Sequence, residues 1–504
     1  MADILKSWNG EAVATGDVPL LPLARFQGIL CDVITAGGRV VALFGRDEGG
    51  KVLVTAALAD DPDNRIGLLS TMVEDSWPSL AEECPAVQAF ERELAEQYGV
   101  VPERHPWRKP LRFEHSRAKV RDAFGRPPTW PDIPGDYPFF RVEGEEIHEV
   151  AVGPVHAGVI EPGHFRFQCH GEQVLHLEIV LGYQHRGVEQ LLEAGPGPRA
   201  LAVAETIAGD TSIGHGLAYC RALEALAGVE APPRASFLRG IALELERLAN
   251  HIGDLGMLAG DVGFQPTASA CGALRAEFLN ATAEICGNRF GRSLLTPGGV
   301  HFDLAPDEAV RLAEKVARAS ERVRTATLLF FRSPSARNRT DGTGVVSRRL
   351  CDELGLVGPA ARACGSTRDV RRDHPFGIYR FAHIPVVTAD TGDVFGRAWV
   401  RHLECERSAD FVVQQLRNLP EGPLRTKLPP LPPDRLTVSM VEGWRGEIAH
   451  VAVTGKDGRV ARWKVKDPSF HNWMGLAQAL RGQQISDFPL CNKSFNLSYA
   501  GHDL

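Results

Sequence analysis

The sequence predicts an α+β protein in which a small α+β N-terminal domain precedes a mostly helical large domain with a small β-sheet. Its 504 residues exceed what one hydrophobic core holds, so more than one domain is expected. A hydrophobic fraction of 44% and a charged fraction of 24% are typical of a globular chain. Three zones differ in pattern: residues 1–115 mix strand-like runs with a helix, residues 116–147 are rich in proline, and residues 148–504 have mainly helical periodicity.

The first zone contains two strand signals and one helix signal. Residues 40–44 and 51–56 are apolar, rich in β-branched side chains and flanked by glycine-containing segments, which predicts strands. Within residues 86–98, apolar side chains recur every three or four positions, which is the spacing of an amphipathic helix. Gly99 follows as a typical residue just beyond a helix end. This zone is therefore predicted to form a small α+β domain.

The rest of the chain divides into a linker and the large zone. Prolines cluster in residues 116–147 and resist both helix and sheet, so this segment is predicted to be a linker. The large zone opens with two short strand-like runs. Long helical periodicity, with glycine or proline near each end, then predicts helices within residues 198–227 and 233–258. Residues 447–454 and 459–465 predict a β-hairpin around a Lys-Asp-Gly turn.

Composition argues against several function classes. The net charge of −7 gives the chain no general attraction to nucleic acid or anionic lipid. We find no run of about 18 uncharged apolar residues that would encode a transmembrane helix, and the first residues lack a secretory signal. We therefore expect a cytoplasmic protein that meets the membrane only through partners. The 10 cysteines are scattered without a Cys-x-x-Cys pair, so we expect no zinc or iron–sulfur site in this chain.

The densest polar segment is residues 153–167, where His156, Glu161, His164 and Arg166 stand among glycines and prolines. A loop of this kind aims several titratable groups at one cavity, and histidine and carboxylate carry protons near neutral pH. These residues are therefore candidate catalytic groups. The alternative is a solvated loop with no role in chemistry.

A second polar cluster lies in residues 176–189, where an apolar strand runs into a turn and then a helix. Tyr183, His185 and Arg186 stand at the strand end, which is a common place for a binding site. Helix capping and surface pairing are the alternative.

A third group of charged residues lies within residues 239–251, which are predicted to be helical. Glu244, Arg247 and His251 share one helical face through three- and four-residue spacing. That pattern usually indicates an exposed ladder of ion pairs, which is our expectation here.

These segments together resemble a known family. The large zone is similar to the large subunit of membrane-bound, energy-converting (group 4) nickel–iron hydrogenases and to the homologous 49-kDa-type subunit of respiratory complex I, the NADH-quinone oxidoreductase. The first zone resembles the 30-kDa-type subunit of complex I, fused ahead of it. The motifs that carry the resemblance are YGVVPERHPWRKPLR from residue 98, GPVH and EPGHFRF in 153–167, LGYQHRGVEQL from 181, GVVS from 344, LVGPAARACG from 356, DVRR from 369 with Tyr379, GDVFGR from 392 and PSF from 468.

The resemblance implies a domain division and a fold. Residues 1–115 would form the 30-kDa-like domain and residues 116–147 the linker. Residues 148–504 would form a mostly helical domain like the nickel–iron hydrogenase large subunit, with a small β-sheet. The family motifs occur in order along nearly the whole chain.

The chain departs from the family pattern at the metal ligands. Hydrogenases of this family bind nickel and iron through two Cys-x-x-Cys pairs, and here Ala208, Thr211, Ser498 and Gly501 stand in those places. Alanine and glycine have no side-chain donor, and neutral hydroxyls replace thiolates poorly on a soft metal. We therefore expect no nickel–iron centre and no hydrogen turnover.

Other residues gain roles from the resemblance. Glu161 looks like the glutamate that passes protons beside the metal in these hydrogenases. Asp210 and His215 belong to the segment of the first ligand pair, and we count them as candidate cofactor-binding residues. Tyr183, His185 and Arg186 are the remaining members of that set.

In the complex I relative, a loop histidine and a tyrosine farther along bind the quinone headgroup. His156 and His164 are the candidates for the histidine. No tyrosine stands between residues 184 and 218, where the second partner is expected, and Tyr183 is left as an open substitute.

Three functions are compatible with this pattern. The first is a redox subunit of a membrane-bound, complex I-like oxidoreductase that passes electrons to quinone or an unknown acceptor with coupled proton transfer. The second is a non-catalytic subunit that docks the other subunits of such a complex. The third is an active nickel–iron hydrogenase with unusual ligands.

The resemblance also implies partners and a location. An iron–sulfur small subunit, which would hold the cluster in place of this chain, and antiporter-like subunits of a membrane arm are the expected partners. No nucleic acid is expected among them. These partners would hold the chain peripherally on the cytoplasmic side of the inner membrane.

Overall fold

The computed structural model describes residues 3–117, 122–126, 133–156 and 160–504. Three of the linker prolines, Pro127, Pro128 and Pro131, lie outside the described residues, as do positions 157–159 of the first polar segment. From residue 116 to residue 146, the described residues form no helix or strand. Helices and small, mostly antiparallel sheets make up the rest, which confirms the predicted α+β class.

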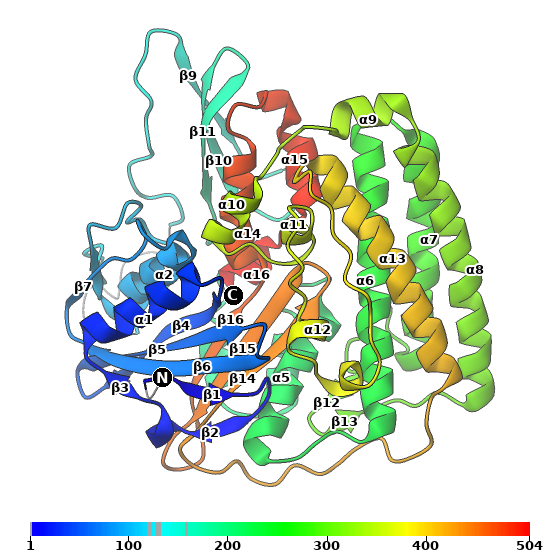
Figure 1. Ribbon diagram of the computed structural model, residues 1–504, viewed down its shortest axis with the longest axis horizontal. Coiled ribbons are helices and arrows are strands. Elements are labelled where there is room, and N and C mark those ends of the chain that lie inside the picture. The colour runs from blue at the N-terminus through cyan, green and yellow to red at the C-terminus, as the bar shows by residue number, and fades with distance from the viewer. Residues whose placement is uncertain (1–2, 118–121, 127–132, 157–159) are drawn as a thin grey trace.

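A five-stranded sheet organises the first zone, with α1 (Leu23–Thr35) and α2 (Gln88–Tyr98) packed on it (Figure 1). Its strands are β1 (Leu5–Ser7), β3 (Leu20–Leu21), β4 (Arg39–Glu48), β5 (Lys51–Asp60) and β6 (Arg65–Val73). The predicted strands at 40–44 and 51–56 are thus confirmed. Gly99 caps α2 with a left-handed φ of 73°. Smaller elements of this zone are η1 (Thr15–Asp17), η2 (Pro85–Val87), β7 (Ser76–Pro78) and β8 (Val101–Glu103).

A second antiparallel sheet joins the chain's two ends. β14 (Arg435–Gly443), β15 (Gly446–Thr454) and β16 (Val460–Lys466) lie in sequence order, and the β15–β16 pair confirms the predicted hairpin. The N-terminal strand β2 (Ala12–Ala14) pairs with β14. Because Phe44 of β4 lies in the same hydrophobic core as Trp463 of β16, the first zone and the large zone share buried apolar surface.

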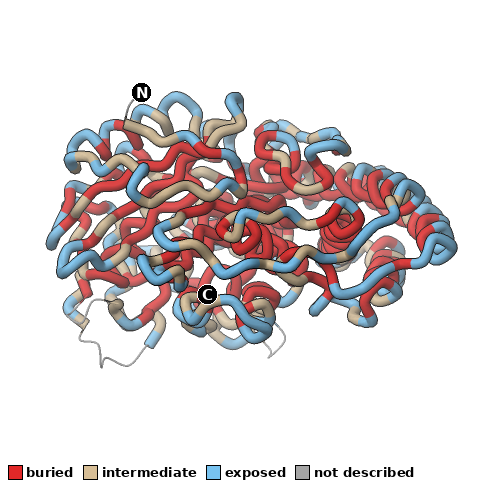
Figure 2. The backbone as a smooth tube through the Cα atoms, turned by 90° about the horizontal axis from the view of Figure 1, so that it is seen from below, coloured by how far each residue is buried: buried red, intermediate tan, exposed pale blue. Residues whose placement is uncertain are grey.

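Four long helices pack together beside this sheet (Figure 1). They are α6 (Pro233–Asp261), α7 (Gln265–Cys286), α8 (Pro306–Phe331) and α13 (Val394–Arg417). The buried backbone runs through the sheets and the inward faces of these helices (Figure 2). The shorter elements are α3 (Val188–Glu193), α4 (Pro198–Glu205), α5 (Ser212–Ala227), β12 (Leu295–Thr296), β13 (Gly299–Val300), α9 (Pro334–Thr340), α10 (Arg348–Leu354), α11 (Gly358–Arg362), α12 (Val370–Asp373), η3 (Gly377–Arg380), α14 (Ser469–Ala479), η4 (Ile485–Asp487), α15 (Phe488–Phe495) and α16 (Tyr499–Asp503).

A three-stranded sheet, in the order β11-β10-β9, projects from the body at the top of Figure 1. Its strands are β9 (Ile147–Val152), β10 (His164–His170) and β11 (Gln173–Val180). His164 and Arg166 therefore lie on a strand, and the expectation that the whole 153–167 segment is a loop is wrong at its C-terminal end. Backbone pairing with both neighbours overrides the glycine and proline signals there.

The helix predicted within residues 198–227 is interrupted. It forms as α4 and α5, with a non-helical segment at residues 206–211 between them. Asp210 binds Arg445 and Thr211 binds Trp444, both far along the chain, and those contacts outweigh the helical periodicity.

The expected exposed ladder at Glu244, Arg247 and His251 is also wrong, because all three side chains are buried in α6. Oppositely charged groups on other elements cover them. Glu244 binds Arg371 at 3.1 Å, and His251 Nε2 lies 2.8 Å from Glu404 on α13. The three residues do share one face of the helix, as predicted, but that face belongs to a charged cluster inside the protein.

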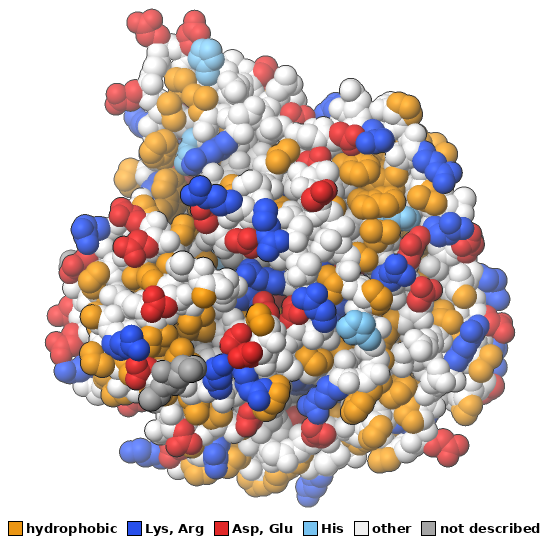
Figure 3. Space-filling model, in the orientation of Figure 1, with side chains coloured by type: hydrophobic (Ala, Val, Ile, Leu, Met, Phe, Trp, Pro, Cys, Tyr) orange, Lys and Arg blue, Asp and Glu red, His pale blue; other side chains and the backbone are white. Residues whose placement is uncertain are grey.

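Two further features concern the surface charge and the helices. Lys and Arg side chains are interspersed with Asp and Glu over the face shown in Figure 3. None of the helices that the structure describes combines the length and the apolar character needed to cross a membrane.

Candidate functional site

The four positions where the family's hydrogenases carry cysteine are buried in two segments that the fold brings together. Ala208 and Thr211 lie between α4 and α5, and Ser498 and Gly501 lie at the start of α16. Arg186 connects the segments. It donates to the carbonyls of Thr206 at 2.7 Å, Ile207 at 3.0 Å and Ala500 at 3.2 Å.

The loop that carries Tyr183, His185 and Arg186 also anchors the C-terminal residues. The Asp503 carboxylate accepts the backbone N–H groups of Gly182 at 2.8 Å and Gln184 at 2.9 Å. His185 Nδ1 lies 2.8 Å from the Asp503 carbonyl. Tyr183 is partly buried, which raises the pKa of its phenol. His185 and Arg186 therefore hold this end of the chain in place through backbone carbonyls.

An arginine far along the chain lies at the centre of the site. Arg445 binds both carboxylate oxygens of Asp210, at 2.6 and 2.8 Å, and stacks over Trp444 at 3.9 Å. Burial opposes ionisation of Asp210, but the Arg445 guanidinium outweighs it and lowers the pKa of that carboxyl. Asp210 is thus an ionised partner that fixes Arg445 in place, and its oxygen also accepts the Thr211 hydroxyl at 3.1 Å.

Glu161 belongs to the same cluster. One of its oxygens accepts the backbone N–H of Tyr499 at 3.2 Å. Burial raises the pKa of Glu161 and nearby Asp210 adds to the rise, while Arg445 opposes it. A carboxyl with a raised pKa that keeps partial contact with solvent is suited to taking up and releasing a proton.

A chain of buried hydrogen bonds lies next to this cluster. It links Trp463, His450, His215 and Asp467. Trp463 donates its indole N–H to His450 Nδ1 at 3.3 Å, so the other nitrogen of a neutral His450 carries the proton. That nitrogen lies 3.2 Å from His215 Nδ1, and His215 Nε2 lies 3.0 Å from Asp467. Burial and the neighbouring His215 lower the pKa of His450 well below its usual range, which keeps it neutral. The hydrogen bonds therefore run in one direction from Trp463 to Asp467.

The residues at the cysteine positions do not fit a nickel–iron centre. A Cβ on Gly501 would lie 2.7 Å from the Asp467 carboxylate, so this carboxylate fills the space of a side chain there. The Ser498 hydroxyl accepts the Gly501 N–H at 2.9 Å, and the Thr211 hydroxyl accepts the Trp444 indole N–H at 3.1 Å. Both hydroxyls are thus engaged by the protein, and neither is a thiolate.

The packing at Gly501 gives a direct stability prediction. Gly501→Ala should lower the free energy of unfolding by about 1–3 kcal/mol, because the new methyl group overlaps the Asp467 carboxylate. Denaturant unfolding measures the change. Gly272→Ala is the matched control: it lies within α7 with no atom near its Cβ, and it should stabilise the chain by about 0.5–1 kcal/mol. A Gly501→Ala variant as stable as the wild type would mean that Asp467 does not occupy this position.

The remaining candidate catalytic residues form a separate group. His164 Nδ1 lies 3.2 Å from the Gly153 carbonyl, and its Nε2 accepts a hydrogen bond from Arg166 Nε at 3.1 Å. Burial lowers the pKa of His164 and the nearby Arg166 adds to the fall, while the hydrogen bond to the Gly153 carbonyl opposes it. Arg166 pairs with Glu149, while His156 Nε2 lies 2.9 Å from the Gly163 carbonyl. These contacts hold the base of the loop that presents Glu161.

Three members of the site were not found by sequence reasoning: Arg445, Asp467 and His450. Each stands alone among apolar or mixed residues in the C-terminal sheet region, 235 or more residues from its partner in the first ligand segment. The one available signal was the presence of His450 among the apolar residues of β15 and of Asp467 directly after β16.

Comparison with known proteins agrees with the fold and the motifs. The family described as respiratory-chain NADH dehydrogenase, 49 Kd subunit, matches residues 261–435 and 429–503. Carbon monoxide-induced hydrogenase of Rhodospirillum rubrum is 33% identical over 69% of this chain and 97% of its own length. Formate hydrogenlyase subunit 5 of Escherichia coli is 29% identical over 93% and 85%, and a subunit of the NADH-quinone oxidoreductase of Dehalococcoides mccartyi is 30% identical over 67% and 92%. The chain therefore belongs to the family of the 49-kDa subunit of respiratory-chain NADH dehydrogenase and the hydrogenase subunits related to it.

Proposed function

We propose that this chain is the redox subunit of a membrane-bound, complex I-like oxidoreductase that has lost the nickel–iron centre. It takes electrons from an iron–sulfur small subunit and delivers them to quinone or another acceptor, with coupled proton transfer. The observation that carries the proposal is the cluster of Glu161, Asp210 and Arg445 beside the former cysteine positions. In this proposal, ionisable groups that exchange protons stand beside the positions where a hydrogenase would hold its metal.

The chemistry of acceptor reduction explains why such a cluster would be kept. Reduction of a quinone to a quinol consumes protons as well as electrons. Glu161 has a raised pKa and stands at the edge of the cluster, so it is suited to supply them. Arg445, held by Asp210, provides a fixed positive charge that favours a developing anion nearby.

The names of the relatives support the proposed assembly: they are subunits of a formate hydrogenlyase, of a membrane-bound hydrogenase and of an NADH-quinone oxidoreductase. In our proposal, the small subunit carries the iron–sulfur cluster, and antiporter-like subunits form a membrane arm. The chain is held peripherally by these partners on the cytoplasmic side of the inner membrane.

A second candidate function is a non-catalytic docking subunit of the same complex. The packing of Asp467 against Gly501 favours it, because protein atoms fill part of the former metal site. An active hydrogenase is the weakest candidate, since none of the four positions provides a thiolate.

Metal and quinone analysis of the intact complex tests these functions. The chain is purified with its small subunit and membrane arm, and nickel, iron, sulfide and extractable quinone are measured against protein. Iron and sulfide without nickel, together with bound quinone, is the expected result. Stoichiometric nickel would overturn the loss of the centre. Neither nickel nor quinone, in a complex that does not reduce a quinone analogue, would favour the docking role.

A further inference from the structure

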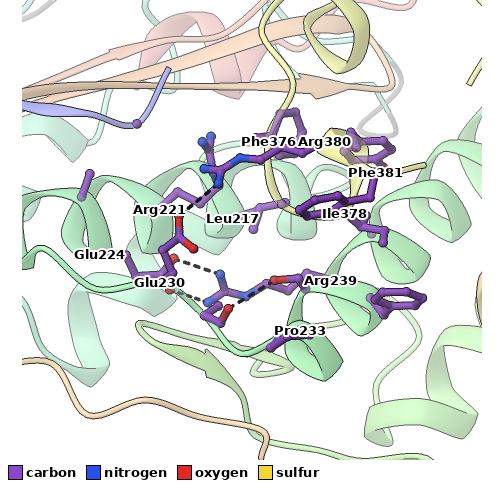
Figure 4. A pocket seen from close by; sticks show the side chains of 18 of the residues that line it. Leu217, Arg221, Glu224, Glu230, Pro233, Arg239, Phe376, Ile378, Arg380 and Phe381 are labelled. Carbon is purple, nitrogen blue, oxygen red and sulfur yellow. Dashed lines mark hydrogen bonds and ion pairs between the residues drawn. The ribbon is translucent and has the colours of Figure 1, made fainter. Parts of the chain in front are cut away.

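A cavity of about 290 Å³ lies between α5, the first turns of α6 and η3 (Figure 4). None of the residues of the candidate site described above lines it. Its volume is at the lower end of the range for small-molecule pockets. Three arginines and two glutamates line it, so its charged side chains carry an excess of one positive charge. These residues are Arg221, Glu224, Glu230, Arg239 and Arg380.

The carboxylates of the cavity are already engaged. Glu224 binds Arg239 through both oxygens, at 2.6 and 3.0 Å. At the rim, Glu230 pairs with Arg380 at 3.0 Å. Arg221 is thus the arginine of this cavity that has no carboxylate partner among the residues the structure describes.

Arg221 is nine-tenths buried, and its hydrogen bonds go to neutral groups. Nη1 donates to the carbonyl of Met440 at 2.9 Å, and Nη2 donates to the carbonyl of Asn9 at 3.3 Å. Burial lowers the pKa of Arg221 to about 9, at which the side chain remains a cation at neutral pH. Glu224 and Glu230 partly stabilise this cation from a distance, but neither forms an ion pair with it. A buried cation without a directly paired anion is costly, and an anion in the cavity would offset part of that cost.

The backbone around Arg221 leaves room for its guanidinium. Gly10 has a φ of 78°, and a Cβ there would lie 2.7 Å from Arg221 Nη2. A side chain at this position would therefore displace the guanidinium. The arginine is held from one side by Gly10 and from another by the ring of Phe376, whose centroid is 4.8 Å from its Cζ.

The rest of the cavity wall is largely apolar. Leu217, Phe237 and Ile378 line it, and Phe381 at the rim is 87% exposed. Apolar and aromatic side chains are the usual lining of small-molecule pockets, and Phe381 extends this lining to the rim. We propose that this cavity binds a small organic monocarboxylate, whose carboxylate pairs with Arg221 and whose apolar body contacts Ile378 and Phe381.

Phenylacetate is a suitable probe, because it joins one carboxylate to one aromatic ring. Calorimetric titration of the full-length chain should show saturable binding of one phenylacetate per chain in the millimolar range or tighter. Its uncharged analogue 2-phenylethanol should bind at least about tenfold more weakly, since it cannot pair with the guanidinium. Arg221→Gln should weaken phenylacetate binding by at least about tenfold.

Two further variants separate loss of the site from loss of the fold. Ala225→Phe fills the cavity and keeps Arg221, and it should abolish binding while the chain unfolds at its usual temperature. Arg318→Gln removes an exposed arginine on α8 and should bind phenylacetate as the wild type does. Absence of saturable binding to the wild type would overturn the proposal, as would equal binding to the wild type and to a folded Ala225→Phe variant.

Discussion

Glu161→Gln should reduce turnover of the intact complex by at least about 10²-fold, the lower end of what a positioned general acid contributes. Glutamine keeps the size of the side chain and can still accept the Tyr499 N–H, but it cannot release a proton. The pKa of Glu161 is raised by burial, so the wild type should lose its proton-donating form as the pH rises through that pKa. The alkaline limb of the rate profile that reports this loss should be missing in the variant. Steady-state electron transfer to a quinone analogue, measured across neutral pH, tests the prediction.

A structural role for Glu161 predicts a different pattern. Glu161→Asp keeps a titratable carboxyl and should restore part of the rate, together with the alkaline limb. Glu145→Gln removes an exposed carboxylate at the edge of the projecting sheet and serves as the matched control, with unchanged turnover. Normal turnover of Glu161→Gln across this pH range would show that protons do not reach the acceptor through this residue.

Local patterns were sufficient to predict the strands at 40–44 and 51–56 and the hairpin at 447–465, because each pairs with a neighbour close in sequence. The break between α4 and α5 was not predicted. It depends on Asp210, whose partner Arg445 lies 235 residues away. When a helix is interrupted so that one of its residues can form a distant ion pair, its own periodicity still predicts a continuous helix.

The candidate site shows the same limit. The first polar segment contains Glu161, and the family motifs indicated the segment of Asp210 and His215. The residues that complete the cluster, Arg445 and Asp467, lie in the turn between β14 and β15 and just beyond β16, and only the folded sheet brings them to that segment. The histidines and arginine grouped with Glu161 by sequence instead bind the backbone, each other and Glu149.

The buried charged cluster around Glu404 should make a large contribution to the free energy of unfolding. Glu404 on α13 accepts Arg362 Nε at 2.7 Å and lies 2.8 Å from His251 Nε2, with 3% of its side chain exposed. Glu404→Leu should lower the free energy of unfolding by about 3–5 kcal/mol, because it removes one of the two carboxylates that accept hydrogen bonds from the buried Arg362 and leaves buried N–H groups of Arg362 and His251 without an acceptor. Denaturant unfolding at neutral pH measures the loss.

The effect of Glu404 should also depend on pH in a defined direction. Burial opposes its ionisation, but Arg362 and His251 outweigh it and lower the pKa of Glu404 well below its usual range. Its contribution is therefore complete above the pKa of an unfolded glutamate, about 4.3, and is lost as the pH falls toward the folded-state value. The stability difference between Glu404→Leu and the wild type should shrink on acidification. Glu353→Leu, which removes an exposed partner of Arg349, should change stability by no more than about 0.5 kcal/mol at any of these pH values. Equal effects of the two variants would mean that the buried cluster contributes no more than a surface pair.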